Sequence, residues 1–591
     1  MLHLPRIMLA APGSGSGKTM ITCGILQAFR ERGQNPASFK CGPDYIDPMF
    51  HARVIGTPSR NLDTFFTDPQ TTRYLFAKTA KDAGISVLEG VMGIYDGLGG
   101  ISVKASSYDL AAVTETPVIL IVNARGMSLS VIPLIQGYLN YQSQCRVSSR
   151  TETLNGCDVQ HQHGHGIIRG VILNQTTQMT YHLLKDEIEK QTGVHVYGYV
   201  PKLEDAAVES RHLGLVTPNE IADLKSRLTR LGEELEQCLD LDGILALAQE
   251  AADYGEEELR LPESVGRYVD GWRQNVPETA GAPENQDAPE AASMQKNQDA
   301  PLLAVAQDEA FCFYYQDNLE LLEILGAKLI PFSPLHDKGL PEGISGLLLG
   351  GGYPELYAEQ LSQNDTMKAS IKKAVDHGLP YLAECGGFMY LHEEMEDMDG
   401  RSWPVCGCIP GRSYRTKKLG RFGYITLSVR MEEEHPLETI AKDHPAKTTA
   451  ESYPEALAAK DSQNENTAKA HQAAMTAENC DREQGTFGET EQHEMCRGLY
   501  ENQRFRDQYI SAGWGFLRPG ETIRAHEFHY FDSTDPGKAY IAQKPIGKRT
   551  WDCIHASRQS VAGYPHLYYW SNPDFAARFV SCARKYRRRG I

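Results

Sequence analysis

Short apolar runs alternate with longer amphipathic stretches along roughly the first 250 residues of the chain. Five of these runs are RIMLAA, ISVLEGVMG, TPVILIVNA, IRGVILN and VHVYGYVP. Such runs are typical of strands that are buried between two layers, and the periodic stretches between them are long enough to form helices. The pattern predicts a parallel sheet covered by helices, which is the α/β architecture of nucleotide-binding domains.

A second series of the same kind follows in the C-terminal half. Its apolar runs are PLLAVAQ, AKLIPFSP, GISGLLLGGG and LPYLAECGG, and FGYITLSV, ETIRAHEFHY and VAGYPHLYY close it as further strands. A chain of 591 residues is also too long for a single hydrophobic core. We therefore expect two α/β domains, at 1–264 and 302–591.

Two segments interrupt the apolar pattern and have little to bury. Residues 265–301 are rich in Pro, Ala, Asn, Gln and Glu and contain NQDAP twice, which is typical of a linker. Residues from about 433 to 500 are rich in Glu, Ala, Lys and Gln and lack sustained periodicity. The second segment is predicted to be a surface insertion in the C-terminal domain.

A smaller insertion, at about 143–166, carries histidines at alternate positions: His161, His163 and His165. On an extended strand these three side chains would share one face and could bind a metal ion. The alternative is a solvated polar tract, because no Cys, Asp or Glu completes a first shell.

The net charge of the chain argues against nucleic acid or an anionic membrane as a binding partner. The formal net charge is −18 and the pI is about 5.6, so the mean field of the molecule repels nucleic acid and anionic membranes. No apolar run reaches the length of a membrane span, and the N-terminal residues lead into a glycine-rich loop instead of a cleavage site. The 13 cysteines show no repeating pattern, which favours reduced thiols. We expect a cytoplasmic protein that acts on small molecules, and the sequence is compatible with a homodimer.

The segment RIMLAAPGSGSGKTMITCGIL predicts a strand, a Gly/Ser-rich loop and a helix. The candidate nucleotide-binding residues are Gly13, Gly15, Gly17, Lys18 and Thr19. Glycines let main-chain amides approach phosphate oxygens, Lys18 would bridge the terminal phosphates, and Thr19 would bind magnesium. Pro12 stands where the standard motif has its first glycine. The segment predicts a phosphate loop that departs from the standard spacing.

Carboxylates form two clusters in the same half, one on a turn between Pro43 and Pro48 and one after the strand that carries Val87 and Leu88. Asp44 and Asp47 lie in FKCGPDYIDPMFH, and Glu89 and Asp96 lie in VLEGVMGIYDG. Carboxylates at the C-terminal ends of parallel strands lie at the edge where open α/β sheets bind ligands, and there they can hold magnesium. An alternative for Asp44 and Asp47 is that they only cap a turn.

Together, GSGSGKT, KCGPDYIDPMFH, LEGVMGIYDG, VILN and ESRHLGLV resemble the cobyrinate (or hydrogenobyrinate) a,c-diamide synthase family of cobalamin biosynthesis. The N-terminal half is similar to dethiobiotin synthetase, and the resemblance covers nearly all of both domains outside the linker and the insertions. It implies a P-loop domain that uses ATP to phosphorylate a carboxylate of a corrin ring. Ammonia then attacks the acyl phosphate and forms the amide.

The resemblance also assigns roles to individual residues. It implies magnesium binding at Thr19, Asp44 and Glu89. It implies substrate contacts at Lys40, Asp47, Asp96 and Arg211. Lys40 and Arg211 would meet carboxylates of the substrate, although Lys40 is equally placed to contact phosphate.

In the second domain, LAECGG puts Cys385 after an apolar strand and before a predicted helix. Such a turn holds a nucleophile exposed, and a helix N-terminus lowers the pKa of a thiol. The alternative is an inert buried cysteine, which the flanking glycines disfavour. The turn resembles the nucleophile turn of class I glutamine amidotransferases, with Ala383 where many members have glycine.

The resemblance to class I amidotransferases implies further parts of an ammonia-producing site. Main-chain amides of Gly351, Gly352 and Gly386 are the candidate oxyanion donors. The general base is either His529 or His566. We favour His566 because it follows the last strand of the domain, where that family has its catalytic histidine. Tyr568 stands where class I enzymes usually carry the glutamate that orients this histidine.

The sequence thus predicts an enzyme that amidates the a- and c-carboxylates of cobyrinate with ATP, Mg²⁺ and glutamine. Cobyric acid synthase and nickel-sirohydrochlorin a,c-diamide synthase are alternatives of the same class. An ATP-dependent partitioning or regulatory protein is an alternative of a different class. Such a protein would need neither Cys385 nor an oxyanion loop.

Overall fold

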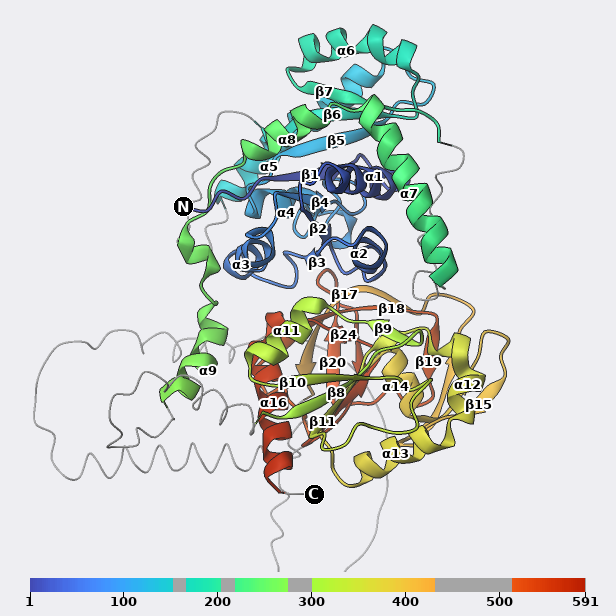
Figure 1. Cartoon of the computed structure of the whole chain (residues 1–591). Coiled ribbons are helices and arrows are strands. Elements are labelled where there is room, and N and C mark those ends of the chain that lie inside the picture. Colours follow the sequence, from blue (N-terminus) through green and yellow to red (C-terminus); the bar gives the residue numbers. More distant parts are fainter. Residues whose placement is uncertain (152–165, 204–217, 275–299, 431–512, 590–591) are drawn as a thin grey trace, which may run out of the picture. The chain divides into compact units, whose positions relative to one another are not determined.

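The N-terminal half of the chain folds around a seven-stranded sheet in which every neighbouring pair of strands is parallel. The strand order is β3-β2-β4-β1-β5-β6-β7, shown in blue to teal in Figure 1. The strands are β1 (Arg6–Ala10), β2 (Pro36–Cys41), β3 (Ser59–Leu62), β4 (Ile85–Glu89), β5 (Val118–Asn123), β6 (Ile168–Asn174) and β7 (His195–Val200). The sheet confirms the predicted α/β class for this half.

The structure, a computed structural model, describes residues 1–151, 166–203, 218–274, 300–430 and 513–589. By their contacts, Met1–Arg430 and Gly513–Ile591 form one compact unit. Among the described helices, none has the length and apolar content needed to cross a bilayer. Predictions that fall outside the described residues concern the histidine tract, Arg211 and the insertion at 433–500.

Helices cover both faces of the N-terminal sheet, because alternate strand residues point to opposite sides. Ile7 and Leu9 of β1 belong to one buried core, and Met8 and Ala10 belong to another. The helices that share the first core are α1 (Lys18–Glu31), α7 (Pro218–Cys238) and α8 (Leu241–Gln249). Those that share the second are α3 (Pro69–Ala80), α4 (Ser107–Val113), α5 (Val131–Thr151) and α6 (Gln178–Thr192).

One edge of this sheet collects the candidate residues. Strands β1, β2, β4 and β6 are parallel, so their C-terminal ends meet at the same edge. The phosphate loop follows β1 and the short helix α2 (Ile46–Phe50) follows β2 after a turn. Glu89 and Asn174 are the last residues of β4 and β6. The fold therefore brings four separate parts of the sequence to one place.

The C-terminal half has a six-stranded sheet of order β10-β8-β11-β13-β23-β22, parallel except for β22. Its strands are β8 (Leu302–Ala306), β10 (Lys328–Phe332), β11 (Gly346–Leu349), β13 (Tyr381–Glu384), β22 (His555–Ser557) and β23 (Ser560–Gly563). Helices of this half are α11 (Gln316–Ile324), α12 (Ala358–Gln363), α13 (Asp365–Asp376), α14 (Gly386–Leu391) and α16 (Pro573–Arg588). This second parallel sheet confirms the α/β class for this half as well.

Further strands of the C-terminal half form smaller sheets. A five-stranded antiparallel sheet contains β17 (Arg421–Val429), β18 (Thr522–His529), β20 (Tyr540–Gln543), β21 (Thr550–Cys553) and β24 (His566–Leu567). A four-stranded sheet contains β14 (His392–Glu396), β15 (Ser402–Pro404), β16 (Ile409–Arg415) and β19 (Phe531–Ser533). The short strands β9 (Phe311–Phe313) and β12 (Gly351–Gly352) pair with each other.

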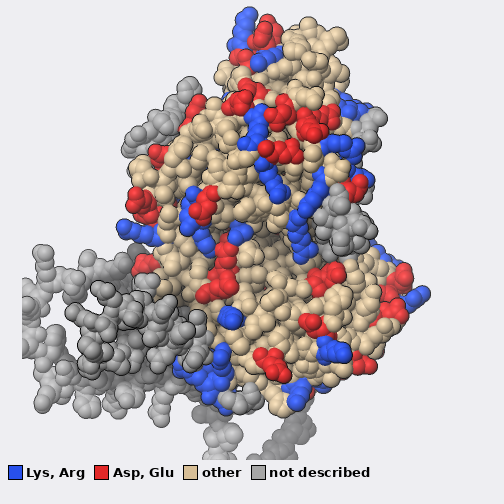
Figure 2. Space-filling view, viewed as in Figure 1, with Lys and Arg blue, Asp and Glu red and all other residues tan. Residues whose placement is uncertain are grey.

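Two segments differ locally from the pattern expected of the sequence. Helix α9 (Glu263–Gln274) occupies the first part of the predicted linker. Helix α5 continues to Thr151, into the stretch predicted as the smaller insertion. On the face drawn in Figure 2, acidic and basic side chains are interspersed.

Candidate active site

The phosphate loop is shaped by a glycine that no other residue can replace without strain. Gly17 precedes α1 with φ 88° and ψ 14°, a left-handed conformation. A Cβ atom at Gly17 would lie 2.4 Å from Nδ2 of Asn174. That amide nitrogen donates to the carbonyl of Ser16 at 2.8 Å and so braces the loop. Asn174 is thus a supporting residue of the loop, contributed by the end of β6.

Lys18 is buried, with 8% of its surface exposed. Its ammonium donates to the carbonyls of Gly13 at 3.0 Å and Met92 at 2.6 Å, not to a carboxylate. Burial lowers the pKa of Lys18, and the neighbouring charge of Lys40 lowers it further. A buried ammonium beside a second cation is stabilised by an anion, and the glycine-rich loop suits a phosphate.

Lys40 lies at the centre of the carboxylates predicted to handle metal and substrate. Its ammonium donates to Asp47 at 2.5 Å and Glu89 at 2.7 Å, and lies 4.0 Å from Asp44. Burial alone would lower the pKa of Lys40, but the three carboxylates outweigh it and raise the pKa above its usual value. Lys40 therefore neutralises carboxylates that would otherwise repel a phosphorylated ligand.

The residues around Glu89 fit a magnesium ion that arrives with a nucleotide. The hydroxyl of Thr19 donates to Oε1 of Glu89 at 2.6 Å. Glu89 is fully buried, and among the described residues its Oε2 atom accepts no hydrogen bond. No described group of three or more His, Cys, Asp or Glu forms a complete metal site. A site of this kind suits Mg²⁺, which is commonly held by one or two protein oxygens together with phosphates and water.

Asp44 and Asp96 both stabilise turns. Oδ1 of Asp44 accepts from the amides of Ile46 at 2.8 Å and Asp47 at 3.3 Å. Oδ2 of Asp96 accepts from the amide of Gly93 at 2.8 Å. Asp44 therefore caps its turn through Oδ1, while its Oδ2 lies on the side of Lys40.

Cys385 occupies the sharp turn between β13 and α14 that the sequence predicts. Its φ of 50° and ψ of −106° lie where residues other than glycine are strained. A Cβ atom at Gly387 would lie 2.2 Å from the carbonyl oxygen of Leu349, and one at Gly386 would lie 2.8 Å from Pro354. The flanking glycines are required because the turn packs directly against the strand end that precedes Gly351.

The expected lowering of the Cys385 thiol pKa is wrong. The residue is only 7% exposed, and burial raises its pKa, as does the charge of Glu355. The Gly386 amide opposes this change but is outweighed. Helix α14 has only six residues, so its N-terminus offers little compensation. A thiol with a raised pKa needs a neighbouring base to remove its proton before it can act as a nucleophile.

His566, on β24, is packed against the predicted oxyanion strand. A Cβ atom at Gly351 would lie 2.5 Å from Cε1 of His566. A Cβ atom at Gly386 would lie 3.3 Å from the amide nitrogen of Gly352. The strand Gly351–Gly352 therefore lies against both the histidine and the nucleophile turn.

The His566 ring is neutral and buried. Burial lowers its pKa to about 3, and His529 adds to the effect. Among the described residues, its Nδ1 atom makes no hydrogen bond. Its ring stacks on His526 of β18 at 4.9 Å. The sequence alone did not suggest His526, which is half of a cross-strand pair that only the register of β18 and β24 reveals.

The two halves of the chain match two family models. Residues 7–216 match the CobQ/CobB/MinD/ParA nucleotide binding domain, and residues 303–487 match the CobB/CobQ-like glutamine amidotransferase domain. Relatives named cobyrinate a,c-diamide synthase match much more of the chain. The one from Caldanaerobacter subterraneus is 30% identical over 585 residues, which is 98% of this chain and 99% of its own.

Two further relatives of that name are similar over both domains. The one from Dehalococcoides mccartyi is 36% identical over 430 residues, covering 73% of this chain and 82% of its own. The one from Salmonella typhimurium is 37% identical over 418 residues, covering 71% and 80%. The chain belongs to the cobyrinate a,c-diamide synthase family.

Membership of the cobyrinate a,c-diamide synthase family confirms the predicted family, fold and enzyme class. The fold joins a P-loop nucleotide-binding domain to a glutamine amidotransferase domain, and the class is a glutamine-dependent ligase. The amidotransferase match ends at 487, before His566. The assignment of individual site residues therefore rests on the geometry.

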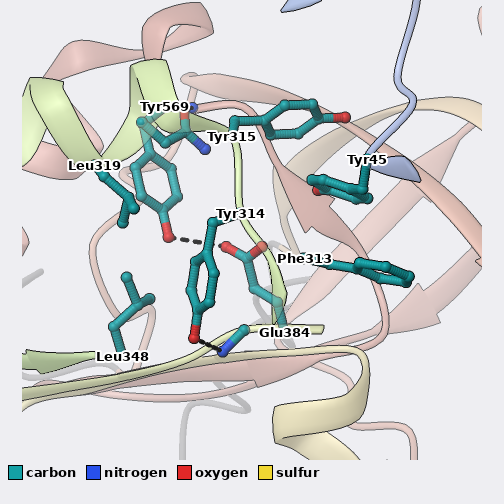
Figure 3. Close-up of a pocket in the computed structure, with 10 residues that line it drawn as sticks. Tyr45, Phe313, Tyr314, Tyr315, Leu319, Leu348, Glu384 and Tyr569 are labelled. Carbon is teal, nitrogen blue, oxygen red and sulfur yellow. Dashed lines mark hydrogen bonds between the residues drawn. The ribbon is translucent and has the colours of Figure 1, made fainter. Parts of the chain in front are cut away.

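Glu384 connects the nucleophile turn to the histidine strand in this family member. It precedes Cys385, and its carboxylate accepts from the hydroxyl of Tyr569 at 2.9 Å and the amide of Leu567 at 3.4 Å. Figure 3 shows Glu384 and Tyr569 facing each other beside a small cavity. In the sequence, the only sign of this role is a single glutamate at the end of the apolar run YLAEC. The hydrogen-bond partners of this glutamate lie about 180 residues further along the chain.

Replacing Glu384 by glutamine is expected to stabilise the fold increasingly as the pH rises. Burial raises the pKa of Glu384 to about 8, although the hydrogen bonds from Tyr569 and Leu567 lower it. Between the ordinary carboxyl pKa and about 8, the folded chain therefore keeps a proton that the unfolded chain has lost. The free energy of unfolding therefore falls as the pH rises from the ordinary carboxyl pKa to about 8. At about 1.4 kcal/mol per pKa unit the upper bound is roughly 5 kcal/mol.

Thermal unfolding of the Glu384→Gln variant measures this effect. The Tm of the variant should exceed that of the unmodified chain by a margin that grows from about pH 6 to about pH 8.5. Exposed Glu394→Gln is the control and should show no such trend. A Tm difference that is constant with pH would show that Glu384 is already ionised in the folded protein.

Proposed function

We propose that this chain uses ATP and glutamine to amidate the a- and c-carboxylates of cobyrinate through acyl phosphates, in cobalamin biosynthesis. The observation that carries the proposal is that one compact unit contains a phosphate loop with a buried lysine and a cysteine on a strained turn. Relatives that this chain matches over most of their length are named for that activity. We also propose domains at 1–264 and 302–591, joined by a linker at 265–301.

In the proposed first step, the loop residues Gly13 to Thr19 bind the phosphates of ATP. The ammonium of Lys18 lies within the loop, where it donates to the carbonyl of Gly13. Its positive charge would stabilise the negative charge on the transferring phosphoryl group. Thr19, Glu89 and Asp44 would hold the magnesium ion, whose charge neutralises that of the phosphates. Asp47, Asp96, Lys40 and Arg211 remain proposed contacts for the carboxylate substrate.

In the proposed second step, the Cys385 sulfur attacks the carboxamide carbon of glutamine. The thiol proton passes to the neutral ring of His566, whose Nδ1 atom makes no hydrogen bond within the described residues. Amides of Gly351, Gly352 and Gly386 stabilise the oxyanion. His566 then returns the proton to the leaving nitrogen, ammonia is released, and water hydrolyses the thioester to glutamate.

Contacts around Tyr45 support transfer of ammonia from one site to the other. Tyr45 follows Asp44 in the sequence, and its ring lies 5.2 Å from the ring of His566. It also stacks on Phe313 at 5.1 Å and lines the small cavity beside Glu384. The turn that carries a proposed magnesium ligand thus adjoins the proposed base. Ammonia would have a short path to the acyl phosphate.

Mass spectrometry of corrinoids incubated with the chain, ATP, Mg²⁺ and glutamine tests the proposal. We expect cobyrinate to gain two amides and its a,c-diamide to gain none. Amidation of the a,c-diamide would instead indicate that the enzyme modifies other side chains of the ring. Amidation of nickel sirohydrochlorin in preference to cobyrinate would overturn the choice of ring.

A further inference from the structure

Polar side chains with buried, unused hydrogen-bonding atoms gather on one face of β17 and β18. Arg421 of β17 lies opposite His529 of β18, and Glu527 lies two residues from His529. Opposed residues of an antiparallel pair, and residues two apart on a strand, share one face. Nε2 of His529 lies 3.7 Å from Oε2 of Glu527. None of these residues has a role in the proposed steps above.

This cluster adjoins the nucleophile turn. The amide of Cys385 donates to the carbonyl of Gly563 at 2.8 Å. The next residue, Tyr564, stacks on the ring of His529 at 4.2 Å with an interplanar angle of 14°. Tyr564 also packs against Phe388 of α14 at 5.2 Å. Three successive contacts therefore link Cys385 to Glu527.

Several buried atoms of this cluster have no hydrogen-bond partner among the described residues. Glu527 is 0% exposed, and within the described part of the chain neither of its carboxylate oxygens accepts a hydrogen bond. The same holds for Nη1 of Arg421, Nε2 of His529 and the hydroxyl of Tyr564. A buried carboxylate without hydrogen bonds is strongly disfavoured in a folded protein. These atoms indicate a ligand that supplies both donors and acceptors.

We propose that this cluster binds the α-amino and α-carboxylate groups of glutamine, with Glu527 receiving the ammonium and Arg421 receiving the carboxylate. An α-amino acid carries both charges on one carbon, which matches a carboxylate and a guanidinium on one face of a sheet. Its side-chain carboxamide then extends towards Cys385. The inference rests on the proposed function, which makes that carboxamide the target of the thiol.

Glu527 would determine which amides are accepted. A buried acceptor built for an ammonium group is left without a partner by a ligand that lacks the group, and such sites reject the deficient ligand strongly. Glutaramate is glutamine without its α-amino group. It therefore isolates the interaction assigned to Glu527 without changing the reacting amide.

The test compares glutamine and glutaramate as substrates of the full chain. The unmodified enzyme should prefer glutamine by at least about 100-fold in kcat/KM. Glu527→Gln should reduce this preference to less than about tenfold, mainly through a higher KM for glutamine, and Glu527→Asp should retain part of it. Exposed Glu394→Gln is the matched control and should keep the full preference. An unchanged preference in Glu527→Gln would overturn the proposal.

A pair of arginine variants tests the other half of the site independently. Arg421 and Arg549 both lie over the ring of Trp551, at 5.5 and 5.4 Å, but only Arg421 belongs to the cluster. Arg421→Gln should raise the KM for glutamine at least about tenfold, and Arg549→Gln should not. Equal KM values in the two variants would overturn the assignment, even if Glu527→Gln does not fold. If the unmodified enzyme did not use glutamine at all, the proposed function would fail instead.

Discussion

Cys385→Ser is expected to reduce glutamine-dependent amidation at least about 10³-fold while synthesis from ammonium chloride continues near the unmodified rate. A serine hydroxyl is a much weaker nucleophile than a thiol, and the proposed base is weak because burial lowers the pKa of His566 to about 3. Ammonia from solution bypasses this step, since the proposed acyl phosphate would form at the phosphate loop in the other domain. Product formation with each nitrogen source, at saturating ATP, measures the two activities.

Cys582→Ser on α16 is the control, because this partly exposed cysteine lies outside the proposed site. It should retain both activities. Loss of ammonia-dependent synthesis in Cys385→Ser, with the fold intact by circular dichroism, would mean that the thiol has a role beyond glutamine hydrolysis. Equal survival of both activities would remove Cys385 from the mechanism.

The sequence predicted the motifs that depend on neighbouring residues. The loop before Lys18 and the turn at Cys385 need glycines at fixed short spacings, so local sequence is enough to find them. Strands β2 and β3 were not predicted, because they carry buried polar residues where apolar runs are expected. Lys40 on β2 and Asn61 on β3 are examples of such residues. Lys40 donates to Asp47 and Glu89, and Asn61 donates to the carbonyls of Gly42 and Asp44.

Long-range convergence explains what the sequence could not predict. The sign of the pKa change at Cys385 depends on burial and on Glu355, which only the folded chain brings together. Glu384 acts through Leu567 and Tyr569, and the stacking of His526 on His566 depends on strand register. Each of these relations joins distant residues through strand pairing or close packing, so no local spacing reports it.

The absence of a glutamate at the position of Tyr568 also has a structural explanation. The Tyr568 ring stacks on Phe66 at 4.7 Å, so it packs against the N-terminal half and does not orient His566. His566 is instead held by stacking on His526, whose Nδ1 lies 3.0 Å from the hydroxyl of Tyr315. The amide of the next residue after His566, Leu567, donates to Glu384.

Lys18→Ala is expected to abolish synthesis from both glutamine and ammonia, by at least about 10³-fold. The variant removes the buried ammonium that the loop holds with the carbonyls of Gly13 and Met92. Without it, charge on the transferring phosphoryl group is stabilised only by main-chain amides and the bound cation. ADP release and amide formation, each measured with both nitrogen sources, test this expectation.

The control for Lys18→Ala is Lys190→Ala, which removes an exposed lysine from α6 and should leave both activities unchanged. Glutamine hydrolysis by the Lys18 variant, measured as glutamate release without the corrinoid, should persist, because Cys385 and His566 lie in the other domain. This pattern is the reverse of that for Cys385→Ser. Opposite losses in the two variants would separate the phosphate site from the ammonia site, whereas normal turnover in Lys18→Ala would show that the loop does not bind the reacting phosphates.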